Sequence, residues 1–506
     1  MSFILLSILL LPVLSIPFIY LAGRKSAKSA AILLAVVVLV TLALVLTTVP
    51  TILNSAAHRF VESYDWIPAL NSNFTLFVDG ISLSMAIVTM VLILAASLFS
   101  INYMQGKKNL ATYYALLGLL FVGLVGVFIT SNLLLFYFCW ELVLVPAFFI
   151  IGGWGYKDSY KASIKFFVFT HAGAVFVLLG IGAIYMLTGS IDLFTAEKLL
   201  FNANPEIVKW VLISLTAGFA VKMAIFPVHM WLPDAHAEAP APMSALMSGV
   251  LISAGAYAMI RISIETVLPA VTQLSPAFGA DFLHGLAIFG VVSAFFGSFV
   301  ALTETDIKRV MAYSSISHMG YILFGVSLFS PLTLQTAMTG TVLHVVTHAL
   351  SKGLFFFAGG AVMSALEIRN IKDMGGLAGK MPVTGTSSAI AALSLAGAPP
   401  FACFISEFFI FMGAFQLIQI DSFYIVPTAL MLIATVLSLA YSLRFVSNVF
   451  LGTSKGKEGA EGEKKKLEVP RFMQLAMVIV LVLVVVIGFY PSFFINLINT
   501  ATATFI

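Results

Sequence analysis

Four charged residues of this sequence stand inside long apolar runs. Glu141 lies in LLLFYFCWELVLVPAFFII and Glu407 in APPFACFISEFFIFMGAF, whereas Lys222 lies in LTAGFAVKMAIFPVHMW and Lys352 in LHVVTHALSKGLFFFAGG. An ionisable group in the middle of a bilayer is costly and is usually functional. The alternative is a set of static ion pairs between helices, a weak source of stability because desolvation offsets most of the attraction. We therefore interpret the four residues as a candidate ion pathway.

Histidines extend this pathway. His344, His348 and Lys352 are spaced four residues apart, so they share one face of a helix. Imidazole titrates near neutral pH, which favours a proton relay along this face, and His318 in AYSSISHMGY is a further candidate. A metal site is the competing interpretation. Because the helix with His344 and His348 has neither a carboxylate nor a third histidine to complete one, we expect a relay and no metal.

Two of the charged segments also contain helix-breaking residues. The segment with Lys222 continues to Pro227 and Pro233, and the segment with Glu407 contains Gly397 and the pair Pro399–Pro400. Non-helical backbone inside a membrane is tolerated where protein or water surrounds it. Interrupted helices at corresponding positions of two halves are typical of inverted repeats. We predict one repeat over residues 110–262 and a second over 283–450.

The composition indicates which solvent surrounds these segments. Of 506 residues, 60% are hydrophobic and 9% are charged, with 26 basic and 22 acidic residues. Soluble domains carry about 25% charged residues, so the chain is not a soluble enzyme, a disordered protein or a nucleic-acid binder. With about 20 apolar residues needed per span, the fold class is predicted as an all-α polytopic membrane protein with about fourteen transmembrane helices. The predicted spans are 3–22, 30–53, 78–101, 110–129, 132–152, 163–187, 208–227, 240–262, 283–303, 309–329, 335–364, 384–416, 424–450 and 472–491. Residues 1–109 form three N-terminal helices, and 451–506 form a loop and the last helix.

Lysine and arginine alternate between the two sides of this predicted topology. Most fall in the odd-numbered connections, including the run KGKEGAEGEKKKLEVPR at 455–471, and only Arg59, Lys198, Lys209 and Arg261 fall on the other side. By the positive-inside rule, we expect both termini to lie outside the cytoplasm, in the plasma membrane of a prokaryote.

The sequence predicts no redox centre or catalytic site in this chain. Its two cysteines, Cys139 and Cys403, are too few for an iron–sulfur cluster, which takes about four thiolates, and both lie in apolar runs. No glycine-rich nucleotide-binding motif stands in a suitable context. We expect no cofactor here.

Four stretches resemble a known family: FCWELVLVPAFFIIGGWG, KMAIFPVHMWLPDAHAEAPAPMSALMSGV, ETDIKRVMAYSSISHMGY and LAGAPPFACFISEF. They are similar to the antiporter-like membrane subunits of respiratory complex I and their relatives in F₄₂₀H₂ dehydrogenases, membrane-bound hydrogenases and multisubunit Na⁺/H⁺ antiporters. The match covers most of the chain, and the M-type (chain 4-like) subunit resembles it best. In that family, Glu141, Lys222 and Glu407 correspond to the glutamate of helix 5, the lysine of helix 7 and the charged residue of helix 12.

One position departs from the M-type pattern. Ser253, in SGVLISAGAYA, stands where M-type subunits usually have a lysine, and the His-His-Lys face looks more like the L-type and multisubunit antiporter branches. The resemblance implies one proton channel of a redox-driven pump, in which Glu141 keeps Lys222 protonated and the proton passes to the histidines, Lys352 and Glu407. It also implies other membrane subunits as partners, with iron–sulfur clusters, quinone or other redox carriers in them. Na⁺/H⁺ exchange, in a hydrogenase-type or multisubunit antiporter complex, is the alternative; a scaffold or a solute carrier is less favoured.

Overall fold

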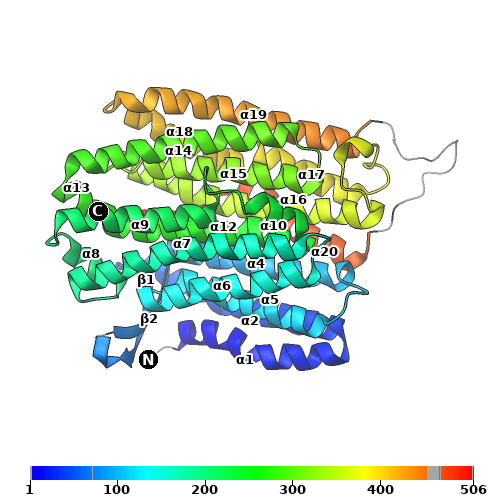
Figure 1. Ribbon diagram of the computed structural model, residues 1–506, viewed down its shortest axis with the longest axis horizontal. Coiled ribbons are helices and arrows are strands. Elements are labelled where there is room, and N and C mark those ends of the chain that lie inside the picture. Colours follow the sequence, from blue (N-terminus) through cyan, green and yellow to red (C-terminus); the bar gives the residue numbers. More distant parts are fainter. Residues whose placement is uncertain (1–2, 71, 453–466, 468, 504, 506) are drawn as a thin grey trace.

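The computed structural model describes residues 3–70, 72–452, 467, 469–503 and 505, and its long helices lie side by side in one bundle (Figure 1). The helices of the first half are α1 (Ile4–Lys25), α2 (Ala27–Leu46), α3 (Val49–Asn54), α4 (Gly80–Tyr103), α5 (Leu110–Ile129), α6 (Leu133–Trp154), α7 (Ser159–Thr188), α8 (Leu193–Leu200), α9 (Pro205–Met223) and α10 (Leu232–Glu238). Those of the second half are α11 (Ala241–Leu246), η2 (Met247–Leu251), α12 (Ile252–Ala258), η3 (Met259–Val267), α13 (Leu268–Leu274), α14 (Pro276–Thr303), α15 (Ile307–Ser327), η4 (Leu334–Met338), α16 (Thr339–Leu366), α17 (Pro382–Leu395), α18 (Ala402–Ile418), α19 (Ile425–Phe450), α20 (Arg471–Phe489) and α21 (Ser492–Thr502).

The all-α membrane class is confirmed. Within the described residues, 11 helices are long and apolar enough to cross a membrane. The three other predicted spans coincide with α9, with α15 and with the pair α17–α18. The count of fourteen spans therefore stays a prediction.

Both predicted helix breaks are present. Helix α9 ends at Met223, where Ala224 adopts a positive φ of 57°, and regular helix resumes at Leu232. The second break separates α17 from α18 and contains Gly397, with a φ of 64°. Pro227, Pro399 and Pro400 have no backbone N–H to continue a helical ladder. The assignment of the two halves as inverted repeats remains a prediction.

Two features were not predicted. The loop expected near 54–77 contains an antiparallel hairpin of β1 (Arg59–Ile67) and β2 (Ser72–Asp79), in which Arg59 pairs with Asp79. The predicted span 240–262 continues to Leu274 as one long helical segment, and its η2 and η3 parts are π-helical. Hydropathy alone does not distinguish a π-helical turn from an α-helical one, and π-turns are frequent at functional sites.

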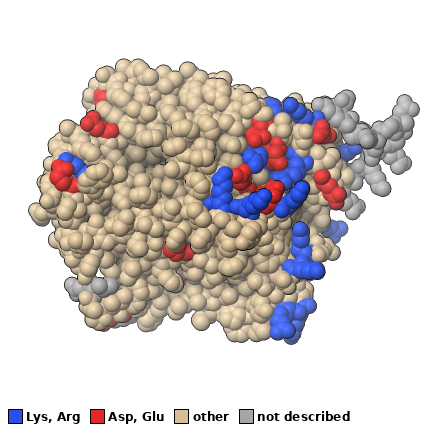
Figure 2. All heavy atoms as spheres, in the orientation of Figure 1, with Lys and Arg blue, Asp and Glu red and all other residues tan. Residues whose placement is uncertain are grey.

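Charges are unevenly distributed along the bundle axis. On the face drawn in Figure 2, most lysine and arginine side chains gather toward one end of the molecule. Both termini lie toward the opposite end (Figure 1). The predicted basic loop lies mostly outside the described residues, because 453–466 and 468 are not among them.

Candidate functional site

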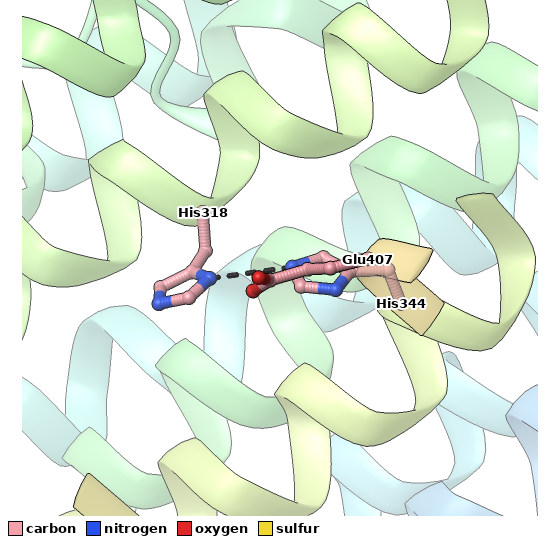
Figure 3. A group of neighbouring side chains, drawn as sticks. All are labelled: His318, His344 and Glu407. Atoms are coloured by element: carbon pink, nitrogen blue, oxygen red, sulfur yellow. Dashed lines mark hydrogen bonds between the residues drawn. The ribbon is translucent and has the colours of Figure 1, made fainter. Parts of the chain in front are cut away.

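Three helices bring together His318 of α15, His344 of α16 and Glu407 of α18. Their side chains are buried, and one nitrogen or oxygen atom of each lies within 4.8 Å of those of the other two. Figure 3 shows the two imidazoles facing each other with the Glu407 carboxylate beside them; His318 Nδ1 and His344 Nε2 are 3.2 Å apart. Glu407 reaches the cluster because α18 restarts at Ala402, directly after the break. All three residues were predicted from the sequence as pathway residues on separate helices, but their contact was not predicted.

Hydrogen bonds continue from both histidines into neighbouring helices. His344 Nδ1 lies 2.9 Å from the Ser406 hydroxyl, which donates to the carbonyl of Cys403 at 2.9 Å. His318 Nε2 lies 3.2 Å from the Tyr441 hydroxyl of α19. Such chains of hydrogen bonds orient the rings and transmit protons. No role was predicted for Tyr441 or Ser406.

His348 and Lys352 lie on the same face of α16 as predicted, and both are fully buried. The Lys352 amine donates to the carbonyl of Met311 at 3.3 Å and to the hydroxyl of Ser314, both on α15. The His348 ring lies 5.3 Å from that of His318, centroid to centroid, and neither of its nitrogens has a hydrogen-bond partner among the described residues. His318, His348 and Lys352 interact electrostatically.

Lys222 is buried at the end of α9, before the break. Its amine donates to the carbonyl of Trp140 at 3.2 Å and lies 3.6 Å from the centroid of the Trp140 ring. A cation over an indole face is stabilised by the ring quadrupole. Lys222 has no ion pair within 4.0 Å in the described part of the chain, so its expected interaction with Glu141 acts only over a longer distance.

Glu141 instead contacts a histidine that the sequence analysis missed. Its Oε2 lies 3.2 Å from Nδ1 of His171 on α7, and the side chains are 25% and 49% exposed, respectively. Because successive helical residues are rotated by about 100°, Trp140 faces α9 while Glu141 faces α7. His171 stands in the apolar run FFVFTHAGAVF, which was a usable signal.

Two further buried groups lie between Lys222 and Lys352 along the chain. Lys308, which the sequence analysis placed in a loop, is 1% exposed and donates to the carbonyl of Ala239 and the hydroxyl of Ser244. His236 is also buried and stacks on Phe356, and it interacts electrostatically with Lys308 and Lys352. Lys308 was misplaced because it lies in the first turn of α15, next to the polar residues Thr305, Asp306 and Arg309.

A separate buried cluster surrounds Arg261, which was predicted to lie at the end of the span 240–262, on the side opposite to most basic residues. Its guanidinium donates to both oxygens of Glu265 at 2.9 and 2.6 Å and to Asp79 at 2.6 Å. Asp79 also caps α4, where it accepts from the backbone N–H of Ser82. Nearby, burial raises the pKa of Glu197 in α8, and Arg59 and Arg261 partly oppose this shift. The i,i+4 spacing of Arg261 and Glu265 was the available signal.

A family model described as NADH:quinone oxidoreductase/Mrp antiporter, TM, matches residues 130–437, more than half of the chain. The chain belongs to this family. A second model, NADH-Ubiquinone oxidoreductase (complex I), chain 5 N-terminus, matches residues 66–114. The predicted resemblance to antiporter-like membrane subunits of the complex I superfamily is thereby confirmed.

Individual relatives of this antiporter-like chain carry the names of M-type subunits. NADH-quinone oxidoreductase subunit M of Rickettsia felis is 30% identical over 498 residues, covering 96% of this chain and 95% of the relative. NADH-quinone oxidoreductase subunit M of Escherichia coli is 33% identical over 438 residues, covering 84% of this chain and 81% of the relative. NAD(P)H-quinone oxidoreductase chain 4 3 of Trichormus variabilis is 33% identical over 404 residues, covering 79% of this chain and 72% of the relative.

Solved structures share the fold of this antiporter-like chain. A chain of the membrane-bound sulfane sulfur reductase, an archaeal respiratory membrane complex, aligns with a TM-score of 0.85 at 24% identity, covering 99% of this chain and 97% of that one. A chain of the Mrp complex from Dietzia sp. DQ12-45-1b aligns with a TM-score of 0.82 at 21% identity, covering 99% of this chain and 97% of that one.

Proposed function

We propose that this chain carries one proton channel of a redox-driven, complex I-like respiratory complex. The observation that carries the proposal is the row of buried titratable groups, several of them in direct contact across α15, α16 and α18. Its relatives are named as subunits of NADH-quinone oxidoreductase. The residues that carry the proton are Glu141, Lys222, His318, His344, His348, Lys352 and Glu407.

Each part of the row has a distinct task. Lys222 holds its proton against the Trp140 carbonyl and ring, and a change in its electrostatic interaction with Glu141 releases that proton toward the centre of the chain. Lys352 and the histidines of α16 receive it through waters and hydroxyls such as that of Ser314. The pair His318–His344 passes it to Glu407 beside the second break. These groups titrate as a coupled set.

Electron transfer takes place in partner subunits. Cys139 and Cys403 are buried on different helices, α6 and α18, and therefore form no thiolate cluster. Iron–sulfur clusters, quinone or other redox carriers belong to the partners, and this chain contributes only the ion pathway. We place the complex in the plasma membrane of a prokaryote with both termini of this chain outside the cytoplasm, because the basic residues gather at the opposite end of the bundle.

Glu141→Gln and Lys222→Ala test the proposal. In the complex reconstituted in vesicles, we expect either substitution to abolish redox-driven proton uptake and to leave the complex assembled. Lys209→Ala is the matched control, because Lys209 pairs with the exposed Glu206 outside the pathway. A complex with this substitution should translocate protons normally. Full translocation in Glu141→Gln or Lys222→Ala contradicts the proposal.

Na⁺/H⁺ exchange is the alternative function, and the family description itself names an antiporter. The same vesicles distinguish the two. Sodium-dependent activity that persists with a protonophore present favours exchange, whereas redox-driven proton uptake without sodium favours the proton channel.

A further inference from the structure

The hydrogen bonds around His318 indicate which of its nitrogens carries the proton. Ser438 uses its one hydroxyl hydrogen to donate to the carbonyl of Leu395 at 2.9 Å, so it accepts from Tyr441 at 2.8 Å. Tyr441 has then used its own hydrogen, and its contact of 3.2 Å with His318 Nε2 requires the imidazole to donate. In the neutral ring, His318 Nδ1 is therefore a lone-pair acceptor.

The hydrogen bonds around His344 constrain the position of its proton in the same way. Ser406 has one hydroxyl hydrogen and contacts the carbonyl of Cys403 at 2.9 Å and the Thr347 hydroxyl at 3.1 Å; when it donates to Cys403, its contact of 2.9 Å with His344 makes Nδ1 of that ring the donor. His344 Nε2 is then an acceptor as well. Two lone pairs thus face each other across 3.2 Å with the Glu407 carboxylate beside them. Such an arrangement needs a cation or a hydrogen-bond donor among the three groups.

We propose that His318, His344 and Glu407 form a binding site for a divalent transition-metal ion of the Zn²⁺ class, which takes the same lone pairs as the translocated proton. A relay without a metal was predicted from the sequence because α16 alone offers no third ligand. The packing of α15 and α18 against α16 supplies one ligand from each of two further helices.

The geometry suits a tetrahedral site. Zn–N bonds of about 2.0–2.1 Å at a tetrahedral angle place two nitrogens roughly 3.3 Å apart, and the observed separation is 3.2 Å. Zinc-binding histidines usually donate their second N–H to a fixed partner, as His318 does to Tyr441 and His344 to Ser406. Glu407 has no hydrogen bond to another described residue, so its carboxylate is free to turn toward the metal.

Glu407 supplies the negative charge that a dication in this cluster needs. This one carboxylate offsets half the charge of the dication, and Lys352 interacts electrostatically with His318 as a like-charged neighbour. The metal closes the pathway only if the function proposed above holds, but its binding does not depend on that function.

Zinc binding to the purified, assembled complex tests the site directly. Zn²⁺ is added in detergent, loosely bound metal is removed by gel filtration, and the remaining zinc is counted per complex. We expect the wild-type complex to retain one more equivalent of Zn²⁺ per complex than the His344→Asn and Glu407→Gln complexes. His236→Asn is the matched control, because His236 is equally buried with unpartnered ring nitrogens but lies outside the cluster, and it should retain the wild-type zinc content.

Two further measurements make the test independent of folding and of transport. Glu407→Gln keeps the shape of the side chain, and co-elution of all subunits reports assembly of each variant. Tyr441→Phe should weaken zinc affinity roughly 10–100-fold through loss of the orienting hydrogen bond. Equal zinc content in wild type, His344→Asn and Glu407→Gln overturns the proposal, as does a loss in His344→Asn without one in Glu407→Gln. A failure of proton uptake in Lys222→Ala leaves these outcomes unchanged.

Discussion

Gly397 has a backbone conformation that few other residues adopt at this position. Its φ is 64°, and a Cβ atom placed on it would lie 2.3 Å from Glu407 Oε2. The left-handed conformation costs a residue with a side chain about 1–2 kcal/mol, and the clash displaces the carboxylate from its position beside His318 and His344. Glycine is thus required both by the break and by the cluster.

Gly397→Ala is therefore expected to lower the thermal midpoint of the assembled complex and to reduce proton uptake. Gly379→Ala is the control, because nothing lies within 4 Å of its Cβ position and its φ is not positive. Differential scanning fluorimetry and vesicle proton uptake measure the two effects. A Gly397→Ala complex with the wild-type midpoint and uptake contradicts this prediction.

Arg261 neutralises two buried carboxylates. Replacing it with leucine leaves Asp79 and Glu265 without their cation, and breaking a buried ion pair in this way costs about 3–5 kcal/mol. We expect Arg261→Leu to lower the yield of assembled complex, measured by size-exclusion chromatography. Lys209→Leu breaks an exposed pair and should have little effect. Adding Asp79→Asn and Glu265→Gln to Arg261→Leu should restore part of the yield, because the two buried charges are then removed. If the yield is not restored, the loss comes from altered packing and not from the unpaired charges.

Single charges in apolar runs were predictable from the sequence, and contacts between helices were not. Lys222, Lys352 and Glu407 stand out because their neighbours are apolar, and all three are buried. Asp79 and Lys308 stand at helix starts, where burial depends on which elements pack over them. The contact of His318 with His344 depends on the packing of α15 against α16, which no local pattern encodes.

At the scale of elements, glycines position the helices that carry pathway residues. On α9, a Cβ on Gly218 would lie 2.5 Å from the carbonyl of Gly173 on α7. On α15, a Cβ on Gly320 would lie 2.5 Å from the carbonyl of Gly290 on α14. Small residues let membrane helices approach closely. The two contacts therefore fix the positions of α9, with Lys222, and α15, with His318.

Gly218→Val is expected to push α9 away from α7 and to move Lys222 off the Trp140 carbonyl. Proton uptake should fall strongly because Lys222 is displaced, although every pathway residue is retained. Gly182→Val, at a position where a Cβ meets nothing within 4 Å, is the matched control on α7. Wild-type proton uptake by Gly218→Val vesicles contradicts this role for the contact.

Long apolar elements were predicted well, since about 20 apolar residues in a row have few alternatives to a membrane helix. The hairpin was harder to predict. Its strand RFVESYDWI pairs with SNFTLFVD across a short connection, and the first strand is largely accessible, so its pattern lacks a continuous apolar signal. Glu62 ties this hairpin to the bundle by accepting from the backbone N–H of Leu6 at 3.1 Å, a contact that only the assembled structure reveals.

At the scale of the whole molecule, the uneven distribution of charge gives the bundle a direction. Both termini lie toward the end opposite to most basic side chains of the face in Figure 2. An alkaline phosphatase fused after Ile506 is expected to be active, and a green fluorescent protein fused there to be dark. The same fusions inserted between Lys107 and Lys108 should give the reverse pattern. Fluorescent fusions at Ile506 would show that the topology is inverted.

The partly exposed contact of Glu141 with His171 has a consequence for biogenesis. Helices α6 and α7 present these polar side chains, 25% and 49% exposed, on the outside of a bundle whose neighbouring surface is apolar. Acyl chains solvate neither group, so a newly inserted copy without neighbours pays a desolvation penalty that docking against a neighbouring subunit removes. We therefore expect an unassembled copy to be less stable in the membrane than an assembled one.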